Sequence, residues 1–206
     1  MTMDNNQEQA HKEKMVRRDQ AFEERQAKAT REKGLIIVHT GAGKGKSTAA
    51  LGMVFRALGN GMKVGIVQFI KGVIDNGESA FIDKLRQQGM PIELHRMGDG
   101  YTWKTQNLQQ DIASARRGWD KAVELLRDPS FDMVVLDEMN IVLKYDYLPL
   151  DEVLAELADK REMLHVIITG RNAKAGLIEV ADLVTDMTQI KHPYRSGIMA
   201  QRGIEF

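Results

Sequence analysis

A glycine-rich segment, residues 39–48, constrains the fold of this chain more than any other feature. It reads His-Thr-Gly-Ala-Gly-Lys-Gly-Lys-Ser-Thr, follows the apolar run 35–38 and leads into the helix-like segment 49–58. In a strand-loop-helix unit of this kind, backbone N–H groups and a helix N-terminus point at anionic oxygens, a lysine adds positive charge, and a hydroxyl holds a metal ion. The segment predicts a nucleotide phosphate loop, with a plain glycine-rich turn as the alternative.

The loop departs from the common phosphate-binding pattern in one respect. The usual spacing, G-x-x-x-x-G-K-[ST], requires a glycine where this chain has Thr40, and the loop also carries an additional lysine, Lys44. Its glycines permit close backbone approach, Lys46 is the expected phosphate contact, and Ser47 is the expected magnesium ligand. The predicted nucleotide-binding residues of the loop are Thr40, Gly41, Ala42, Gly43, Lys44, Gly45, Lys46, Ser47 and Thr48.

Length and composition fit a soluble globular protein with one main domain. The chain has 206 residues, 43% of them apolar, and its uncharged apolar runs are far shorter than the ~20 residues that span a bilayer. The charged N-terminus does not resemble a signal peptide, so we expect a cytoplasmic protein without membrane partners. The absence of cysteine excludes disulfides and thiolate metal sites. Since 29 basic residues balance 29 acidic ones, no nucleic-acid partner is expected, although a local basic groove stays open.

Residues 1–33 form a charged arm that differs from the rest of the chain. They are rich in Gln, Glu, Lys and Arg, and the first glycine of the chain is Gly34. Their composition favours a solvated arm, whereas the alternative is a mobile helix that closes over a ligand as a lid. A thin apolar stripe at helical spacing permits docking and does not require it. The positions at this spacing are Met15, Val16, Asp19, Phe22 and Gln26.

After Gly34, strand-like and helix-like segments alternate. This pattern predicts an α/β fold with a mostly parallel sheet covered by helices on both faces, and ligands bind beyond the carboxyl ends of such strands. The predicted strands are 35–39, 63–70, 92–97, 133–136, 165–169 and 183–187. The predicted helices are 47–58, 77–88, 107–127, 151–161 and 173–180.

Residues 133–138, Met-Val-Val-Leu-Asp-Glu, form an apolar strand that ends in two carboxylates. Beside a phosphate loop, such a strand supplies a second magnesium-holding element. We expect Asp137 to hold or orient the metal and Glu138 to reach a metal-bound water or the substrate. Alone, the pattern fits two solvated acids at a strand end equally well, and the loop favours the functional interpretation.

Two aromatic residues, Tyr101 and Trp103, lie in a turn-rich segment ahead of a predicted helix. Their i, i+2 spacing places both rings on one side of an extended segment. From these residues alone, packing with satisfied polar tips is favoured, and the alternative is a pair of flat surfaces that face a large planar ligand.

The five histidines do not have the helical spacing of metal ligands. His39 and His165 fall in predicted strands, where we expect packing or hydrogen bonding. His192 lies in a polar loop after the last strand, which fits either a nucleotide contact or a surface turn.

Six separated segments occur in a definite order along the chain: 40–48 (TGAGKGKST), 67–72 (VQFIKG), 101–107 (YTWKTQN), 136–138 (LDE), 145–150 (YDYLPL) and 166–171 (VIITGR). Together they resemble the P-loop type of ATP:corrinoid adenosyltransferase. The similarity covers nearly the whole chain, continues from Lys191 and His192 to residues 203–206, and includes the arm. It implies a P-loop, RecA-like domain over residues 34–206 that binds nucleotide and corrinoid.

Members of this family attach the 5′-deoxyadenosyl group of ATP to the cobalt of a corrinoid and release triphosphate. The resemblance implies that ATP lies reversed in the loop, which accounts for Thr40 and the additional Lys44. Lys44 and Lys46, with Mg²⁺ or Mn²⁺, would stabilise the departing polyphosphate. Because Co(I) is itself the nucleophile, no general base is needed. Lys191 and His192 are implied nucleotide contacts.

The family pattern gives Tyr101 and Trp103 the role of displacing the lower axial ligand of the corrinoid, which makes Co(II) easier to reduce. The family usually has phenylalanine at the first position, and the hydroxyl of Tyr101 needs a partner. His39 replaces a residue that is often aromatic, Ala42 stands where asparagine is common, and Ser47 keeps the hydroxyl of the usual threonine. The resemblance also implies a homodimer and an electron donor such as a reduced flavoprotein.

Two other functions remain compatible with the residues. A conventional P-loop kinase or ATPase fits the loop and the two acids, but not the spacing. A non-catalytic, ATP-dependent corrinoid-binding switch would share the same binding residues. Products separate these alternatives, because intact triphosphate and a light-sensitive cobalt–carbon bond arise only from adenosyl transfer.

Overall fold

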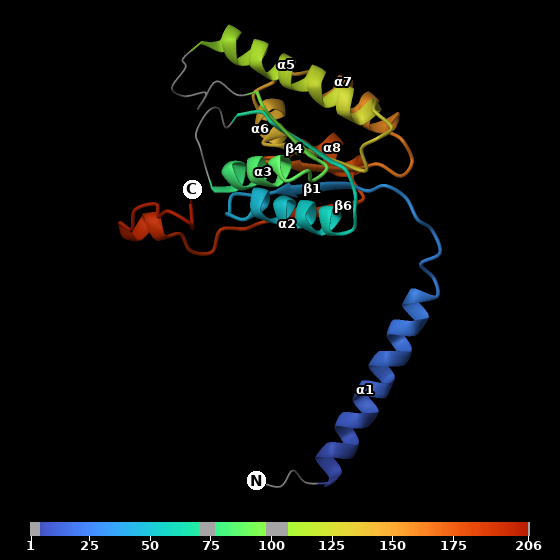
Figure 1. Cartoon of the computed structure of the whole chain (residues 1–206). Helices are drawn as coiled ribbons and strands as arrows, with labels where there is room; N and C mark the ends of the chain where they lie inside the picture. Colours follow the sequence, from blue (N-terminus) through green and yellow to red (C-terminus); the bar gives the residue numbers. More distant parts are fainter. Residues whose placement is uncertain (1–4, 71–76, 98–106, 206) are drawn as a thin grey trace. The chain divides into compact units, whose positions relative to one another are not determined.

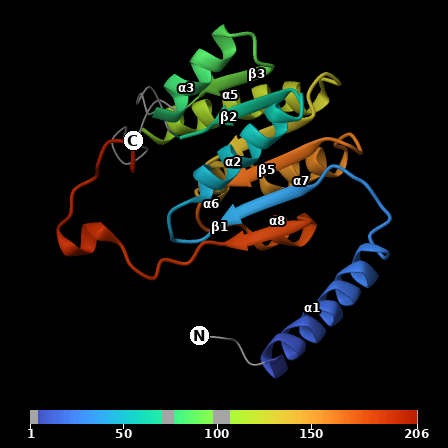
Figure 2. The same cartoon turned by 60° about the horizontal axis from the view of Figure 1, so that its bottom comes forward.

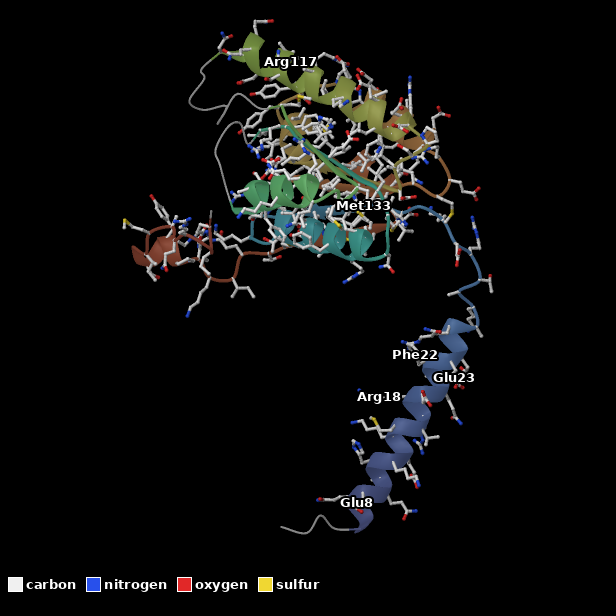
Figure 3. The ribbon with its side chains drawn as sticks, in the orientation of Figure 1. Glu8, Arg18, Phe22, Glu23, Arg117 and Met133 are labelled. Atoms are coloured by element: carbon white, nitrogen blue, oxygen red, sulfur yellow. The ribbon has the colours of Figure 1, made fainter. Side chains whose placement is uncertain are left out.

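The chain consists of two units in the computed structural model, residues 1–33 and residues 34–206. The structure describes residues 5–70, 77–97 and 107–205. The first unit contains one helix, α1 (Asn5–Gln26). Its side chains are exposed from residue 7 onward, Phe22 with 59% of its surface, and those of Glu8, Arg18, Phe22 and Glu23 are labelled on the helix in Figure 3. The predicted arm is helical, and its role as a lid stays a prediction.

The second unit is built on a six-stranded sheet in which the neighbouring strands are parallel. The strand order is β3-β2-β4-β5-β1-β6, and Figure 2 shows several of the arrows running in one direction. All six predicted strands are confirmed, with small differences at their ends. Their bounds are β1 Ile36–Thr40, β2 Val64–Gln68, β3 Ile92–Arg96, β4 Met133–Asp137, β5 His165–Thr169 and β6 Leu183–Asp186.

Helices cover both faces of the sheet, as predicted (Figure 1). On one face, α2 (Lys46–Gly59) and α3 (Gly77–Gln87) bury Val54 and Ile82 against the strands. On the other, α5 (Leu108–Arg127) buries Trp119 in a second apolar cluster. The helices that complete this second layer are α6 (Met139–Lys144), α7 (Leu150–Ala158) and α8 (Ala175–Val180).

Several helix ends follow from local chemistry. The side chain of Asn107 accepts a hydrogen bond from the N–H of Gln110 (3.2 Å) and caps α5. α7 starts directly after Pro149 and ends at Ala158, three residues before the predicted end. The sequence did not predict α6, because an apolar run of this length shows no helical period.

The order of the strands is RecA-like, since β5 lies between β1, which leads into the loop, and β4, which carries the acids. In a parallel sheet the carboxyl ends of the strands meet at one edge. This edge brings together Thr40, Gln68, Asp137, Thr169 and Asp186, the last residues of β1, β2, β4, β5 and β6. Within the described ranges, every helix is too short or too polar to cross a bilayer.

Candidate functional site

The glycine-rich loop joins β1 to α2, as predicted. Gly41 (φ 97°) and Gly45 (φ 106°) have left-handed backbones, which residues with a Cβ rarely adopt. Gly43 donates its N–H to the carbonyl of Met187 (2.6 Å), and a Cβ on Gly43 would lie 2.5 Å from that oxygen. The loop therefore needs glycine at these positions for its own turn and for its close contact with the segment after β6.

Lys46 and Lys44 lie in different environments, although only Gly45 separates them. Lys46 is 8% exposed, and its Nζ donates to the carbonyl oxygens of Gly41 (2.8 Å) and Gly43. The ammonium group thus lies inside the curve of the loop, where phosphate-binding loops need positive charge. Lys44 has an exposed side chain and forms an ion pair with Glu205 near the end of the chain.

Asp137, the first of the two acids, is buried and accepts hydrogen bonds from three side chains. Ser47 Oγ donates to Asp137 Oδ1 (2.8 Å), and Thr169 Oγ1 donates to the same oxygen (2.7 Å). Gln68 Nε2 donates to Asp137 Oδ2 (3.2 Å). The structure thus places Ser47 and Asp137, both predicted to hold the metal, in direct contact, and their role in metal binding stays a prediction. The alternative of solvated acids does not hold for Asp137, which is 3% exposed.

Glu138 follows with a left-handed backbone (φ 65°) and precedes the first residue of α6. Its N–H donates to Thr169 Oγ1 (3.0 Å). A non-glycine residue in this conformation is uncommon and occurs where the surroundings hold it. The turn directs the chain from β4 into α6 and places Glu138, half-buried, directly beside Asp137.

His39 lies near the end of β1, in register with Thr169 of β5. It is 5% exposed, and neither ring nitrogen has a hydrogen-bond partner among the described residues. Burial lowers the pKa of His39, because the protein interior disfavours the charged ring. The expectation that His39 is packed or hydrogen-bonded is confirmed through packing.

The oxygen atoms at this edge suit a hard divalent cation. Ser47 and Asp137 are joined by a hydrogen bond, and Glu138 adds a second carboxylate. In the described part of the chain, no group of three or more His, Asp or Glu residues gathers closely enough to hold a metal alone. Mg²⁺ usually takes one or two protein oxygens and completes its coordination with phosphates and water, so this donor set fits it.

A cavity of about 510 Å³ opens beside the loop, on the side of β6 and α8. Asp186 contributes a carboxylate, and a Cβ on Gly41 would lie 2.2 Å from one of its oxygens. Arg195 from the 3₁₀ turn η1 (Pro193–Ser196) contributes a cation. The lining residues are Thr40, Gly41, Ala42, Asn172, Ala173, Ile178, Asp186, Thr188, Gln189 and Arg195.

The other predicted site residues either do not line this cavity or lie outside the described part of the chain. Lys191 and His192 lie in the segment before η1, and neither lines this cavity. His192 Nδ1 instead accepts the N–H of Tyr194 (3.2 Å). Tyr101 and Trp103 lie outside the described residues.

Gln68 and Thr169 are site residues to which the sequence analysis assigned no role. Each is the last residue of a largely apolar strand at the sheet edge that carries Asp137. A polar residue at the carboxyl end of a buried strand could have indicated both of them. Such a residue occurs in the motifs 67–72 and 166–171, but the sequence does not show that either side chain contacts Asp137.

Comparisons with known proteins agree with the geometry. The family model described as ATP:corrinoid adenosyltransferase BtuR/CobO/CobP matches residues 32–206. A corrinoid adenosyltransferase of Pseudomonas aeruginosa is 50% identical over 199 residues, covering 97% of each chain. One from Sinorhizobium sp. is 52% identical over 197 residues, covering 95% of this chain and 91% of the relative. One from Escherichia coli (strain K12) is 43% identical over 199 residues, covering 97% of this chain and 99% of the relative.

Proposed function

Because this chain belongs to the ATP:corrinoid adenosyltransferase family, we propose that it transfers the 5′-deoxyadenosyl group of ATP to the Co(I) ion of a corrinoid. The electron pair of Co(I) forms the bond to C5′. The bond between C5′ and the α-phosphate oxygen breaks, and its electron pair leaves with triphosphate. No phosphoryl group moves, so the protein has to bind the polyphosphate, stabilise its charge as it departs and keep C5′ accessible to cobalt.

The position of Lys46 is the observation that carries this proposal. Its buried ammonium group points at the carbonyls of Gly41 and Gly43, inside the loop that would hold the polyphosphate. A preorganised positive charge in a partly desolvated site is worth more than the same charge in water, and it favours the leaving group. Lys44 would add charge from the exposed side of the loop.

The hydrogen bonds to Asp137 suit a role in orienting a bound cation. Three side chains donate to its carboxylate, and these bonds fix the direction in which its oxygen atoms point. The residues that would hold Mg²⁺ or Mn²⁺ are Ser47, Asp137 and Glu138. When bound, the cation would supply further charge for the polyphosphate.

Product analysis tests the proposal directly. The protein is incubated without oxygen with ATP, Mg²⁺ and chemically reduced cobalamin, and the optical spectrum and nucleotides are followed. We expect a light-sensitive cobalt–carbon bond and one triphosphate for each adenosylated corrinoid. Formation of ADP or orthophosphate would support a kinase or ATPase instead. ATP binding without a cobalt–carbon bond would support a binding switch.

The proposal includes a role for Tyr101 and Trp103, which rests on the family resemblance. The two rings would displace the lower ligand of the corrinoid, so that a weak reductant can convert Co(II) to Co(I). Trp103→Ala should lower the rate at least about tenfold with Co(II) corrinoid and a reductant, and much less with prereduced Co(I). Equal losses from the two starting states would reject this role.

The arm, residues 1–33, would act as a lid over the corrinoid, and the family resemblance again supports this role. Deletion of residues 1–30 should leave a folded protein that retains corrinoid several-fold less well. Unchanged corrinoid affinity would show that the arm is not a lid. The proposal further includes a homodimer, a reduced flavoprotein as electron donor, Lys191 and His192 as nucleotide contacts, and a cytoplasmic location. The choice between cobalamin and a biosynthetic precursor follows from the same assay with both corrinoids.

A further inference from the structure

The end of β5 connects the two halves of the nucleotide site. On one side, the hydroxyl of Thr169 donates to Asp137 at the end of β4 and accepts the backbone N–H of Glu138, the next residue. On the other, the N–H of Ala173 donates to Thr40 Oγ1 (3.1 Å) at the start of the loop. Because β5 lies between β4 and β1 in the sheet, the segment 169–173 is placed to hold the acids and the loop in a fixed relation.

The hydroxyl oxygen of Thr169 takes part in two hydrogen bonds, as the donor in one and the acceptor in the other. Its hydroxyl donates to Asp137 Oδ1 (2.7 Å) and accepts the N–H of Glu138 (3.0 Å). The residue is fully buried. Because the hydroxyl hydrogen bonds the carboxylate of Asp137 and a lone pair accepts the backbone N–H of Glu138, the Asp137 carboxylate and the Glu138 backbone are held relative to each other.

The neighbouring residues reinforce this connection. Asn140 Nδ2 donates to the carbonyl of Gly170 (2.9 Å). A Cβ on Gly170 would lie 2.9 Å from the Cβ of Asn140 and 3.3 Å from Glu138 Oε2. Gly170 also has φ 125°, which disfavours a side chain. The end of β5 therefore fits closely against the turn that follows β4 and leaves it little freedom to shift.

We propose that Thr169 is a positioning residue that holds the carboxylate of Asp137 and the backbone of Glu138 in one arrangement for the divalent cation bound with ATP. The proposal rests on the proposed function for the identity of the bound nucleotide and metal. Thr169 itself touches the acids, and it acts on the reaction only through them.

Valine is the informative substitution, because it keeps the branched shape and removes the hydroxyl. Thr169→Val would remove the hydroxyl that accepts the N–H of Glu138 and would take one donor from Asp137, to which Ser47 and Gln68 also donate. Thr169→Ser keeps the hydroxyl and loses only a methyl group, so it serves as the conservative rescue.

Thr185 of β6 provides a matched control. It pairs in register with His39 on the opposite side of β1, and it is exposed. Thr185→Val makes the same chemical change in the same sheet, at a strand that does not adjoin β4.

Binding of Mn²⁺ to the full-length protein in the presence of ATP tests the proposal without turnover. Electron paramagnetic resonance measures the free Mn²⁺, and nucleotide alone is titrated separately. Thr169→Val should raise the Mn²⁺ dissociation constant about tenfold, corresponding to the loss of one well-placed hydrogen bond. Thr169→Ser should change it less than about threefold, and Thr185→Val should leave it unchanged. The midpoint of Mg²⁺ activation should shift in the same order, whereas kcat at saturating Mg²⁺ should recover most of its value.

An unchanged Mn²⁺ dissociation constant in folded Thr169→Val would overturn the proposal, and so would equal effects of Thr169→Val and Thr169→Ser. If Thr169→Val fails to fold, Thr169→Cys serves instead, because it has a similar volume and a weaker hydrogen-bond donor. It should raise the Mn²⁺ dissociation constant by an intermediate amount, and an unchanged constant would overturn the proposal. A failure of the proposed function gives a different result. If the Mn²⁺ affinity depends on Thr169 but no cobalt–carbon bond forms, Thr169 is a positioning residue and the protein is not an adenosyltransferase.

Discussion

Two groups of polar and charged residues flank the phosphate loop, and they differ in how exposed they are to solvent. We call them the inner wall and the outer wall. The inner wall consists of buried or half-buried residues, Lys46, Ser47, Asp137, Thr169 and Gln68. Ser47, Thr169 and Gln68 donate hydrogen bonds to Asp137, and Lys46 donates to carbonyls of the loop. The outer wall consists of Lys44, Glu205, Asp186 and Arg195, in which Lys44 and Glu205 form an ion pair and Asp186 and Arg195 line an open cavity.

Exposure decides what these charges can contribute. A charge in the inner wall acts through a medium of low polarity, and a lost partner there leaves a buried polar group unsatisfied. A charge in the outer wall is screened by water and salt, and an exposed ion pair is worth only about 0.2–1 kcal/mol. We therefore expect the inner wall to set the rate of the reaction and the outer wall to adjust nucleotide affinity.

The largest expected effect comes from the inner wall. Lys46→Ala removes the buried ammonium group that donates to Gly41 and Gly43, and turnover should fall about 10²–10³-fold through lost stabilisation of the polyphosphate. Single-turnover spectra measure the rate, and circular dichroism checks the fold. Lys84→Ala, at an exposed position of α3, is the control and should have no effect. Near-normal turnover of Lys46→Ala would show that this lysine does not stabilise the polyphosphate and that the inner wall does not set the rate.

A smaller effect is expected from the outer wall. Lys44→Ala should raise the KM for ATP about fivefold, which corresponds to about 1 kcal/mol. Glu205→Gln should lower it about twofold, because it frees Lys44 from its ion pair. Both effects should shrink when the salt concentration is raised to about 0.5 M. Glu179→Gln on the exposed surface of α8 is the control. A loss of kcat as large as that of Lys46→Ala would place Lys44 in the inner wall.

The smallest expected effect concerns stability at acid pH. Burial lowers the pKa of His39 in the folded protein below the ordinary value of 6.5. The unfolded chain therefore binds the proton first, and stability from this residue is complete above pH about 6.5 and is lost as the pH falls toward the folded-state pKa. His165, whose pKa is also lowered by burial, adds to the same slope.

Melting temperatures at pH 7.5 and 5.5 check this effect. His39→Phe should show a smaller drop between the two pH values than the unsubstituted protein, by roughly 2–4 °C for each 1 kcal/mol. His11→Phe, in α1, is the control that should keep the full drop. An equal drop in His39→Phe and the unsubstituted protein would show that the protein interior around His39 tolerates a charged ring.

Much of the fold could be predicted from the sequence. The apolar runs identified every strand, and local capping and breaking residues such as Asn107 and Pro149 placed helix starts within a residue. The short helix α6 was not predicted, because it begins after a left-handed turn at Glu138 that no local sequence pattern indicates. The loop between β1 and α2 was also predicted, and Ser47 and Asp137 were assigned to one metal site, since the loop and the acid strand each have a recognisable composition; the hydrogen bond between the two residues came from the structure.

The sequence by itself determined which chemical groups this protein can use: a glycine loop with two lysines, a hydroxyl at the helix start, and two acids at a strand end. Tertiary structure alone decided that Gln68 and Thr169, which lie 69 and 32 residues from Asp137, donate to its carboxylate. It also separated a buried Lys46 from an exposed Lys44. The physical reason is that hydrogen bonds and burial depend on which strands are neighbours. Alternating strands and helices are compatible with several strand orders, and β5 between β4 and β1 is only one of them.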